Sequence, residues 1–538
     1  MKKWRSYQSN VVDDTYDAIV IGSGIGGLCT AALLGLKGKR VLVLEKHFKI
    51  GGWTHTFKRK NYEWDVGIHY IGQVNSSRSP IRKLFDIISD GHLEWSAMDT
   101  NYDRIIFPDR SYDFNAPRER FIQDMISYFP KEESAILKYM TLLDSVAKSS
   151  RSYFSQKALA GILDKISYPF MTRKFFKYSD RTTMDVLSSL TKDKQLISVL
   201  TGQWGDHGLP PSKSSFAMHA FVARHYLNGG NYPTGTSRRI AETISDTIEK
   251  NGGSLYVNAP VASIKTHRNK AIGVEMEDGA VIRSKCVISN AGIFNTMERL
   301  LDNNLEPKAV DRLKDIKQTK SYVCLHLGLD RSAEDLGLKN TNLWVYPHYD
   351  HDRAVQEYID NPQNDFPVVY VSFPSAKDES WNEKNPNSST IEAITLSRMQ
   401  WFKKWEHLEW KKRGSDYEDF KEGLSRRIMD VVTKQVDGIK DHIDYQELST
   451  PLTVRDLANY SKGEMYGIDH SPKRFRQKWL RPQSEKKGLY YVGQDITTVG
   501  VSSALFSGTH SVLSPRRRSL KAIEIVNAHN TIIDDRYS

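Results

Sequence analysis

Cysteine is scarce in this chain, and long apolar runs are missing. The 538 residues include three cysteines, Cys29, Cys286 and Cys324, which are far apart and form no C-x-x-C pair. This spacing argues against a disulfide framework and against a cysteine-ligated metal site. It predicts buried core thiols in a reducing compartment. No uncharged apolar stretch reaches the roughly 18 residues that cross a bilayer, so we expect no membrane span.

Signals for export, nucleic-acid binding and metal binding are also lacking. Residues 1–15 are polar and show no apolar secretory core, which favours a cytoplasmic protein. The net charge is +11, but no nucleic-acid motif accompanies it, so we expect no nucleic-acid partner. An anionic membrane surface suits this charge better. The polar run at residues 348–352 contains His348, Asp350, His351 and Asp352, and we expect a solvated loop there and no metal.

A glycine-rich stretch near the start indicates a nucleotide-binding fold. Residues 18–21 are typical of a buried parallel strand, and Gly22, Gly24 and Gly27 follow in the G-x-G-x-x-G register. The first glycine permits a tight turn, the second lets backbone approach a pyrophosphate, and the third lets a helix pack on the strand. The helix expected over residues 28–36 directs its N-terminus at the anion. A plain glycine-rich turn is the alternative.

A second buried strand ends in Glu45, 23 positions after Gly22. A carboxylate there accepts hydrogen bonds from ribose hydroxyls and repels a 2′-phosphate, so NADP is a poor ligand. Lys46 and the pair Gly51-Gly52 follow, an extension that resembles the FAD-binding signature of the amine oxidase and phytoene desaturase group. A solvated strand end is the alternative for Glu45. Together these residues predict a loop that holds the pyrophosphate of FAD.

The C-terminal part of the sequence contains further residues that are predicted to contact the flavin. A strand over residues 488–492 leads into Gly493-Gln494-Asp495, and a helix is expected to begin near Val501. An acid at position 495 can accept a hydrogen bond from a ribityl hydroxyl, and the helix N-terminus can stabilise negative charge on reduced flavin. The alternative for Asp495 is an ordinary turn aspartate. Gly26 and Val261 complete the predicted cofactor-binding set.

The chain exceeds the roughly 250–300 residues at which single cores stop growing, so we expect two domains. The fold class is α/β, with a discontinuous Rossmann-type FAD-binding domain like that of glutathione reductase and amine oxidases, from residues 1–75, 230–315 and 486–538. Residues 76–229 and 316–485 form an α+β substrate-binding domain. Within it, residues 158–178 mix bulky apolar and basic side chains, which predicts a helical lid facing lipid headgroups. A basic helix packed on the core is the alternative.

Motifs along the chain resemble those of retinol saturases, flavoenzymes that reduce the 13,14 double bond of all-trans-retinol. The stretch GIHYIG at residues 67–72 carries this resemblance, which extends over about residues 16–510. Further matching stretches are residues 216–220, 225–226, 229–230, 232–233, 344–347, 449–453, 466–467 and 493–496. Trp53 departs from the pattern, because desaturases usually carry arginine there and saturases a smaller residue.

The resemblance implies FAD-dependent saturation of one double bond in a lipophilic polyene, retinol-like or carotenoid-like. Carotenoid isomerases and desaturases share the fold and the FAD motifs, so isomerisation or desaturation is the alternative. A non-enzymatic lipid-binding protein, like the escort proteins of this fold, is a more distant one.

Saturation needs a proton donor as well as a hydride. His69 and Tyr70 are predicted as donors by their position, with Asp206-His207 second. A histidine bonded within a loop is the alternative for each. No second G-x-G-x-x-G occurs, so we expect an external electron donor of unknown identity.

Overall fold

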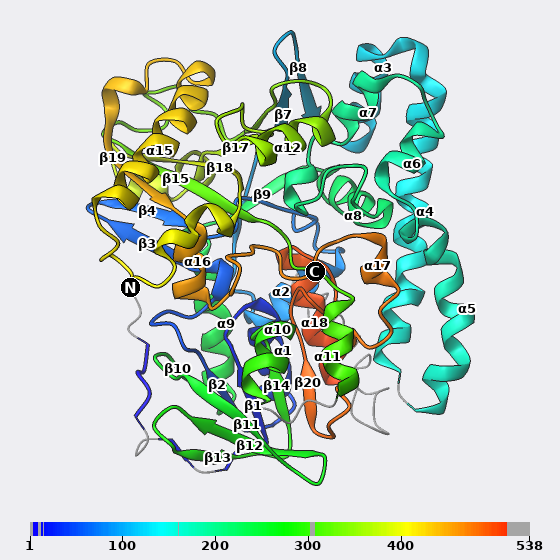
Figure 1. Cartoon of the computed structure of the whole chain (residues 1–538), viewed down its shortest axis with the longest axis vertical. Coiled ribbons are helices and arrows are strands. Elements are labelled where there is room, and N and C mark those ends of the chain that lie inside the picture. The colour runs from blue at the N-terminus through cyan, green and yellow to red at the C-terminus, as the bar shows by residue number, and fades with distance from the viewer. Residues whose placement is uncertain (1–3, 9–11, 14, 160, 302–306, 514–538) are drawn as a thin grey trace, which may run out of the picture.

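Two sheets organise the part of the chain that the computed structural model describes, residues 4–8, 12–13, 15–159, 161–301 and 307–513. A parallel sheet lies in the lower half of Figure 1 and a large mixed sheet in the upper half. Neighbouring strands of the parallel sheet come from distant parts of the chain; Ile19, for example, lies beside Val287. The predicted α/β class is confirmed, whereas the domain boundaries stay a prediction.

The parallel sheet is fully buried in its centre, as its apolar runs predict. Alternate residues of one strand face opposite sides: Val20 packs against helices, and Ile19 packs toward the antiparallel sheet β11-β12-β13. The five strands, in sheet order, are β10 (Ser254–Tyr256), β2 (Val41–Leu44), β1 (Ala18–Ile21), β14 (Val287–Ser289) and β20 (Leu489–Tyr491). The covering elements are α1 (Ile25–Gly35), α9 (Arg238–Lys250), α18 (Val501–Leu513), β11 (Val261–His267), β12 (Lys270–Met276) and β13 (Val281–Arg283).

The mixed sheet joins the two predicted insertions. Strands β7 and β8 come from the first insertion, and β7 pairs in parallel with β16 of the second, Leu343 lying beside Arg104. In sheet order the strands are β19 (Ile443–Ser449), β15 (Ser321–Leu329), β18 (Ser389–Ser397), β17 (Val369–Ser372), β16 (Asn342–Val345), β7 (Asn101–Ile106) and β8 (Ser111–Asn115). The hairpin β3 (Thr56–Arg59) and β4 (Tyr62–Asp65) packs against it through β18.

Helices form a layer along the right side of Figure 1. They are α3 (Arg118–Tyr128), α4 (Glu133–Ala158), α5 (Ile162–Ser179), α6 (Thr183–Ser188), α7 (Lys194–Leu200) and α8 (Phe216–Tyr226). Other helices include α2 (Pro80–Ile88), α12 (His351–Asp360), α13 (Pro374–Lys377), α15 (Ser415–Gln435), α16 (Pro451–Ala458) and α17 (Pro472–Phe475). A small sheet combines β5 (Ile71–Gly72), β9 (Gly230–Pro233) and β6 (Trp95–Ala97). Across the described helices, none is both long and apolar enough to span a bilayer.

Two local predictions are wrong, one of them in part. The alternating pattern of residues 254–264 predicts one strand, but two form, because Asn258 takes a positive φ of 50° and turns the chain between β10 and β11. Residues 348–352 are a solvated loop only in part, since residues 348–350 are half-buried or exposed outside any helix and α12 begins at His351. The Asp350 side chain caps this helix by accepting from the Arg353 N–H, and the His351 ring is buried against the Ser198 carbonyl oxygen, 2.9 Å from its Nε2.

Candidate cofactor and substrate cavity

A cavity of about 610 Å³ opens where the parallel strands end. The residues that follow β1, β2, β14 and β20, namely Gly22, Glu45, Asn290 and Val492-Gly493, all line it. The carboxyl ends of parallel strands are where this class of sheet binds ligands, since loops rather than strands face the space there.

The predicted cofactor-binding residues meet at this cavity, with one exception. Those that line it are Gly22, Gly24, Gly26, Glu45, Lys46, Gly51, Gly52, Val261, Gly493, Asp495 and Val501. Gly27 packs behind the loop instead. A Cβ added there would lie 2.3 Å from the Gly22 carbonyl oxygen, so Gly27 provides the close helix–strand contact predicted for the third glycine.

At this end of the cavity the wall is formed by the backbone of Gly22, Gly24 and Gly493, which carry no side chain. We call this part of the cavity the cradle. A Cβ on Gly24 would lie 2.6 Å from Asn290 Nδ2, and one on Gly493 would lie 2.9 Å from Asn290 Oδ1. Gly22 and Gly493 also take positive φ values of 91° and 101°, which favour glycine. Asn290 was not predicted from the sequence. Its place just after a buried strand is the signal that could have found it.

Glu45 is held by its neighbours in the direction of the cavity. The Ser23 N–H and hydroxyl both donate to Glu45 Oε2, at 2.8 and 2.6 Å, and the His47 N–H donates to Oε1 at 2.8 Å. The Ser23 Oγ also accepts from the Gly51 N–H at 3.0 Å. Ser23, unnoticed in the sequence, therefore ties the glycine loop, the acid and the Gly51-Gly52 pair together.

Asp495 organises the opposite side of the cradle. Its two carboxylate oxygens accept from the backbone N–H groups of Ile293 and Ile468, at 2.8 and 2.9 Å. The buried Arg474 guanidinium supports the same loop by donating to the carbonyl oxygens of Gln494 and Asp495, at 2.6 and 3.0 Å. The ribityl contact of Asp495 stays a prediction, and Arg474 is a further residue that the sequence did not reveal.

Aromatic and aliphatic side chains line the rest of the cavity. Trp53 stacks on Tyr460 with ring centroids 5.9 Å apart, and Tyr322 meets Tyr466 edge to face at 5.7 Å. Further apolar lining comes from Val454, Leu457 and Trp410. We call this aromatic and aliphatic part of the cavity the arm. It is suited to an apolar, conjugated ligand, because its walls offer stacking surfaces and few hydrogen-bonding groups.

The predicted proton donors lie outside the described lining of the cavity. His69 faces Glu392, with its Nδ1 3.0 Å from Glu392 Oε2. The Tyr70 hydroxyl oxygen lies 3.0 Å from Asp103 Oδ2 and 3.3 Å from Asp206 Oδ2. Burial raises the pKa of the Asp206 carboxyl and lowers the pKa of His207 to about 3, so His207 is neutral near pH 7. A donor role for His69 or Tyr70 stays a prediction.

Four residues of β15 line the cavity, Tyr322, Val323, Cys324 and His326. Cys324 is thus not a core thiol, which corrects the expectation for this cysteine; Cys286 is half-buried and Cys29 is buried as predicted. His326 Nδ1 lies 3.2 Å from Glu392 Oε1, and its Nε2 lies 3.0 Å from Ser449 Oγ. A strand over residues 321–329 was foreseeable, but not its cavity-facing side.

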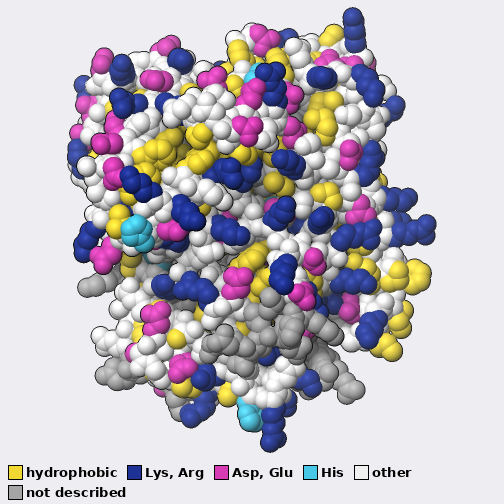
Figure 2. Space-filling view, viewed as in Figure 1, with side chains coloured by type: hydrophobic (Ala, Val, Ile, Leu, Met, Phe, Trp, Pro, Cys, Tyr) yellow, Lys and Arg dark blue, Asp and Glu magenta, His cyan; other side chains and the backbone are white. Residues whose placement is uncertain are grey.

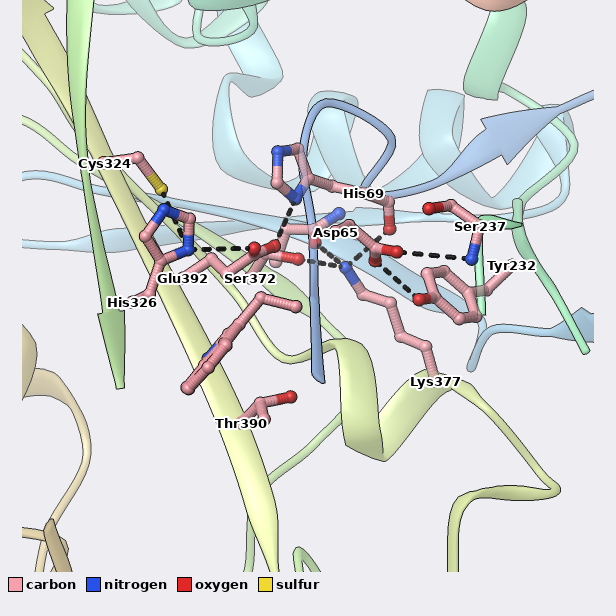
Figure 3. Close-up of polar contacts among 12 residues, drawn as sticks. Asp65, His69, Tyr232, Ser237, Cys324, His326, Ser372, Lys377, Thr390 and Glu392 are labelled. Carbon is pink, nitrogen blue, oxygen red and sulfur yellow. Dashed lines mark hydrogen bonds and ion pairs between the residues drawn. The ribbon is translucent and has the colours of Figure 1, made fainter. Parts of the chain in front are cut away.

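Glu392 joins the two histidines inside the protein. Figure 3 shows the His69 and His326 rings meeting its carboxylate from two sides. Burial alone would raise the pKa of Glu392, but hydrogen bonds and charge from His326 and His69 lower it below the usual range. Nearby, Lys377 donates to the His69 carbonyl oxygen and to Ser372 Oγ, and burial lowers its pKa to about 7.

Comparisons with known proteins place this geometry in a family. Residues 25–512 match the family described as flavin containing amine oxidoreductase. The chain is 35% identical to all-trans-retinol 13,14-reductase of Danio rerio, over 97% of this chain and 90% of that protein. It is 31% identical to an inactive all-trans-retinol 13,14-reductase of the same fish, over 94% and 86%. It is 26% identical to the chloroplastic prolycopene isomerase of Arabidopsis thaliana, over 92% and 82%.

A solved structure of putrescine oxidase bound to putrescine shares the fold. The TM-score is 0.61 at 12% identity, over 95% of this chain and 99% of that chain. The cradle of bare glycine backbone and the acid after β2 suit a dinucleotide, and together with the family match they identify the cofactor as FAD. The chain belongs to the flavin-containing amine oxidoreductases.

Proposed function

We propose that this protein adds two hydrogens across one double bond of a lipophilic conjugated polyene, retinol-like or carotenoid-like. One observation carries the proposal: a single cavity joins the glycine cradle to an aromatic and aliphatic arm. The names of the similar proteins support it, since they act on a retinoid or on a carotenoid.

Residues of the cradle would hold FAD in a defined direction. Helix α1 has Gly24 as its N-cap, with no side-chain cap and no acid in the first turn, so its free N–H groups suit the pyrophosphate. Glu45 suits the adenosine ribose, and the loop from Gly493 to Val501 suits the flavin end. Bound FAD, once reduced, supplies a hydride to carbon. The aromatic pairs around Trp53 and Tyr322 orient an apolar substrate and exclude water.

Cis–trans isomerisation is the second candidate, favoured by the prolycopene isomerase relative. It needs the same cavity but consumes no electrons overall. Saturation requires two electrons per turnover, and we propose that a separate reductant delivers them to FAD.

The test is a single turnover without oxygen. Chemically reduced enzyme is mixed with all-trans-retinol or prolycopene in deuterated water, and product mass and flavin absorbance are followed. Saturation adds two hydrogens and reoxidises the flavin, and both hydrogens can carry solvent label because the N–H groups of reduced flavin exchange with water. A product of unchanged mass with the flavin still reduced identifies an isomerase instead. No product from either polyene refutes both candidates, an outcome that matters because one relative is named inactive.

We also propose that helix α5 rests on an anionic membrane surface. Ile162, Leu163, Ile166 and Phe170 expose 72%, 63%, 61% and 78% of their area, at positions that share one side of the helix. Figure 2 shows hydrophobic side chains at the right edge of the molecule, where α5 runs in Figure 1. Exposed basic residues on the same helix, Lys165, Arg173, Lys174 and Lys177, favour anionic headgroups.

Flotation with liposomes tests this surface. The double variant Ile166→Glu with Phe170→Glu should float poorly, whereas Ile272→Glu, which alters an exposed isoleucine on β12, should float like the wild type. Binding of the wild type should require anionic lipid and weaken as salt rises. Equal flotation of the double variant and the wild type would exclude α5 as the contact.

A further inference from the structure

His326 connects the buried carboxylate of Glu392 to the cavity. Its ring lines the cavity, whereas Glu392, which it contacts at 3.2 Å, is fully buried on β18. His69 contacts the other carboxylate oxygen at 3.0 Å from the far side. The register of the mixed sheet creates this contact, because His326 of β15 lies directly beside Glu392 of β18.

We propose that His326 is the group that protonates the substrate, and that Glu392 and His69 are positioning residues that keep its imidazole charged and oriented. The inference deepens the proposed function and rests on it. Of the two hydrogens added, one arrives as a hydride from the reduced cofactor. The other is the proton on His326 Nε2, so an N–H bond breaks, a C–H bond forms, and the neutral ring regains a proton from water after product leaves.

The charge on Glu392 supports this assignment. A fully buried carboxylate must be compensated by a nearby cation or become protonated, and its pKa is lowered by the two histidines. Lys377 is aimed elsewhere, since its Nζ donates to Asn342 Oδ1, Ser372 Oγ and the His69 carbonyl oxygen. The two imidazoles are thus the partners that compensate the Glu392 carboxylate, and His326 is the one that lines the cavity.

The other groups around His326 do not compete for this role. Glu447 of β19 lies beside it in the sheet, but its carboxylate is paired with Arg59 of β3 at 2.8 and 3.3 Å. Burial keeps the Cys324 thiol protonated by raising its pKa. Asp65 of β4 keeps its proton near pH 7, since burial and the charge of Glu392 raise its pKa to about 8. Phe57 packs edge to face on the His326 ring at 4.8 Å.

The Nε2 side of the ring is oriented toward the cavity by a second contact. Ser449 Oγ lies 3.0 Å from His326 Nε2, and Ser449 also lines the cavity. With Nδ1 fixed by Glu392 and Nε2 directed at Ser449, the ring has one orientation. The proton leaves the ring on the Ser449 side.

Single-turnover kinetics with solvent label test the proton donor. Using a polyene that the wild type reduces, His326→Gln should slow flavin reoxidation and labelled product formation by about 100-fold or more while FAD stays bound. Glu392→Gln should move the pH dependence of the rate to lower pH, because the carboxylate that stabilises the imidazolium is gone. His442→Gln, at an exposed pair with Asp330, is the matched control and should behave as wild type.

Chemical modification of His326 gives a readout that needs no turnover. Diethyl pyrocarbonate reacts with neutral imidazole, so peptide mass mapping across pH reports the charge of each histidine that the reagent reaches in oxidised, FAD-loaded protein. His326 should become reactive at lower pH in Glu392→Gln than in wild type, whereas the control His442 should not change. This comparison remains decisive if His326→Gln does not fold.

Each result has a distinct meaning. A wild-type rate in His326→Gln overturns His326 as donor, and identical reactivity of His326 in wild type and Glu392→Gln overturns the positioning role of Glu392. If the wild type reduces no polyene, the proposed function fails, and the modification experiment still measures the charge coupling by itself.

Discussion

At the scale of single residues, the cofactor cradle depends on glycines, whose backbone is not covered by a side chain. Gly24 lies at the N-terminus of α1, and Asn290 fills the space beside it. Replacing Gly24 with valine puts a Cβ 2.6 Å from Asn290 Nδ2 and adds two methyl groups at the cradle. Purified Gly24→Val should be colourless and should not take up added FAD, as flavin absorbance per chain will show. A fully yellow variant would refute the site.

Ser23 offers a finer change at the same place. Ser23→Ala removes the hydroxyl that donates to Glu45 and accepts from the Gly51 N–H, without adding bulk. Losing one charge-assisted hydrogen bond costs about 1.5 kcal/mol, so the Kd for FAD should rise about tenfold. The control is Ser145→Ala on α4, whose hydroxyl bonds the carbonyl oxygen of Thr141 in its own helix. An unchanged Kd in Ser23→Ala would show that Glu45 needs no such support.

At the scale of helices, two glycines with opposite surroundings allow a matched test. A Cβ on Gly508 of α18 would lie 2.9 Å from both Cys29 Cβ and the Gly26 carbonyl oxygen, whereas one on Gly423 of α15 meets nothing within 4 Å. Gly423→Ala should therefore raise the free energy of unfolding by up to about 1 kcal/mol. Gly508→Ala should lower it by about 1–3 kcal/mol, because α18 must move off α1. Urea denaturation measures both, and stabilisation by Gly508→Ala would contradict the packing.

Periodic helices were the elements that the sequence predicted best. The spacing of Ile240, Ile244 and Ile248 predicts one buried face, and all three are fully buried on α9. The spacing of Phe420, Leu424, Ile428 and Val432 predicts another; on α15 the last three are buried and Phe420 is half-buried. This success has a local cause, since one helix places residues four apart on one side whatever surrounds it. The loop after β1 was equally accessible, because a glycine pattern fixes a backbone shape within a few residues.

Contacts across the mixed sheet could not be predicted in this way. Nothing near His326 in the sequence indicates that Glu392 lies beside it on one strand and Ser449 near it on another. Pairing of distant strands depends on the whole fold. The sequence therefore predicted His69 as a proton donor but could not show that His69 is connected to the cavity through Glu392 and His326. Asn290 and Arg474 were not predicted for the same reason, since each contacts loops that are distant in the sequence.

At the scale of the whole molecule, buried histidines make the fold sensitive to acid. Burial lowers the pKa of His207 and His219 to about 3, and of His225 and His351 to about 4. In the unfolded chain such imidazoles gain a proton below about pH 6.5. Between those limits the unfolded chain binds more protons than the folded one. The contribution to stability is therefore complete above about pH 6.5 and is lost as pH falls.

His219 isolates one such contribution, because burial is the cause of its low pKa and its Nε2 lies 2.9 Å from the Tyr139 hydroxyl. A single buried histidine changes the free energy of unfolding by about 1.4 kcal/mol per pH unit below pH 6.5. His219→Gln keeps an acceptor for Tyr139 but cannot gain a proton. With FAD saturating, its loss of stability between pH 7.5 and 5.5 should be smaller than that of wild type by about 1.4 kcal/mol in urea denaturation. The control His92→Gln changes an exposed histidine and should follow the wild type at both pH values. If His219→Gln and the wild type lose the same free energy of unfolding between the two pH values, the His219 ring takes up its proton equally in the folded and unfolded chains.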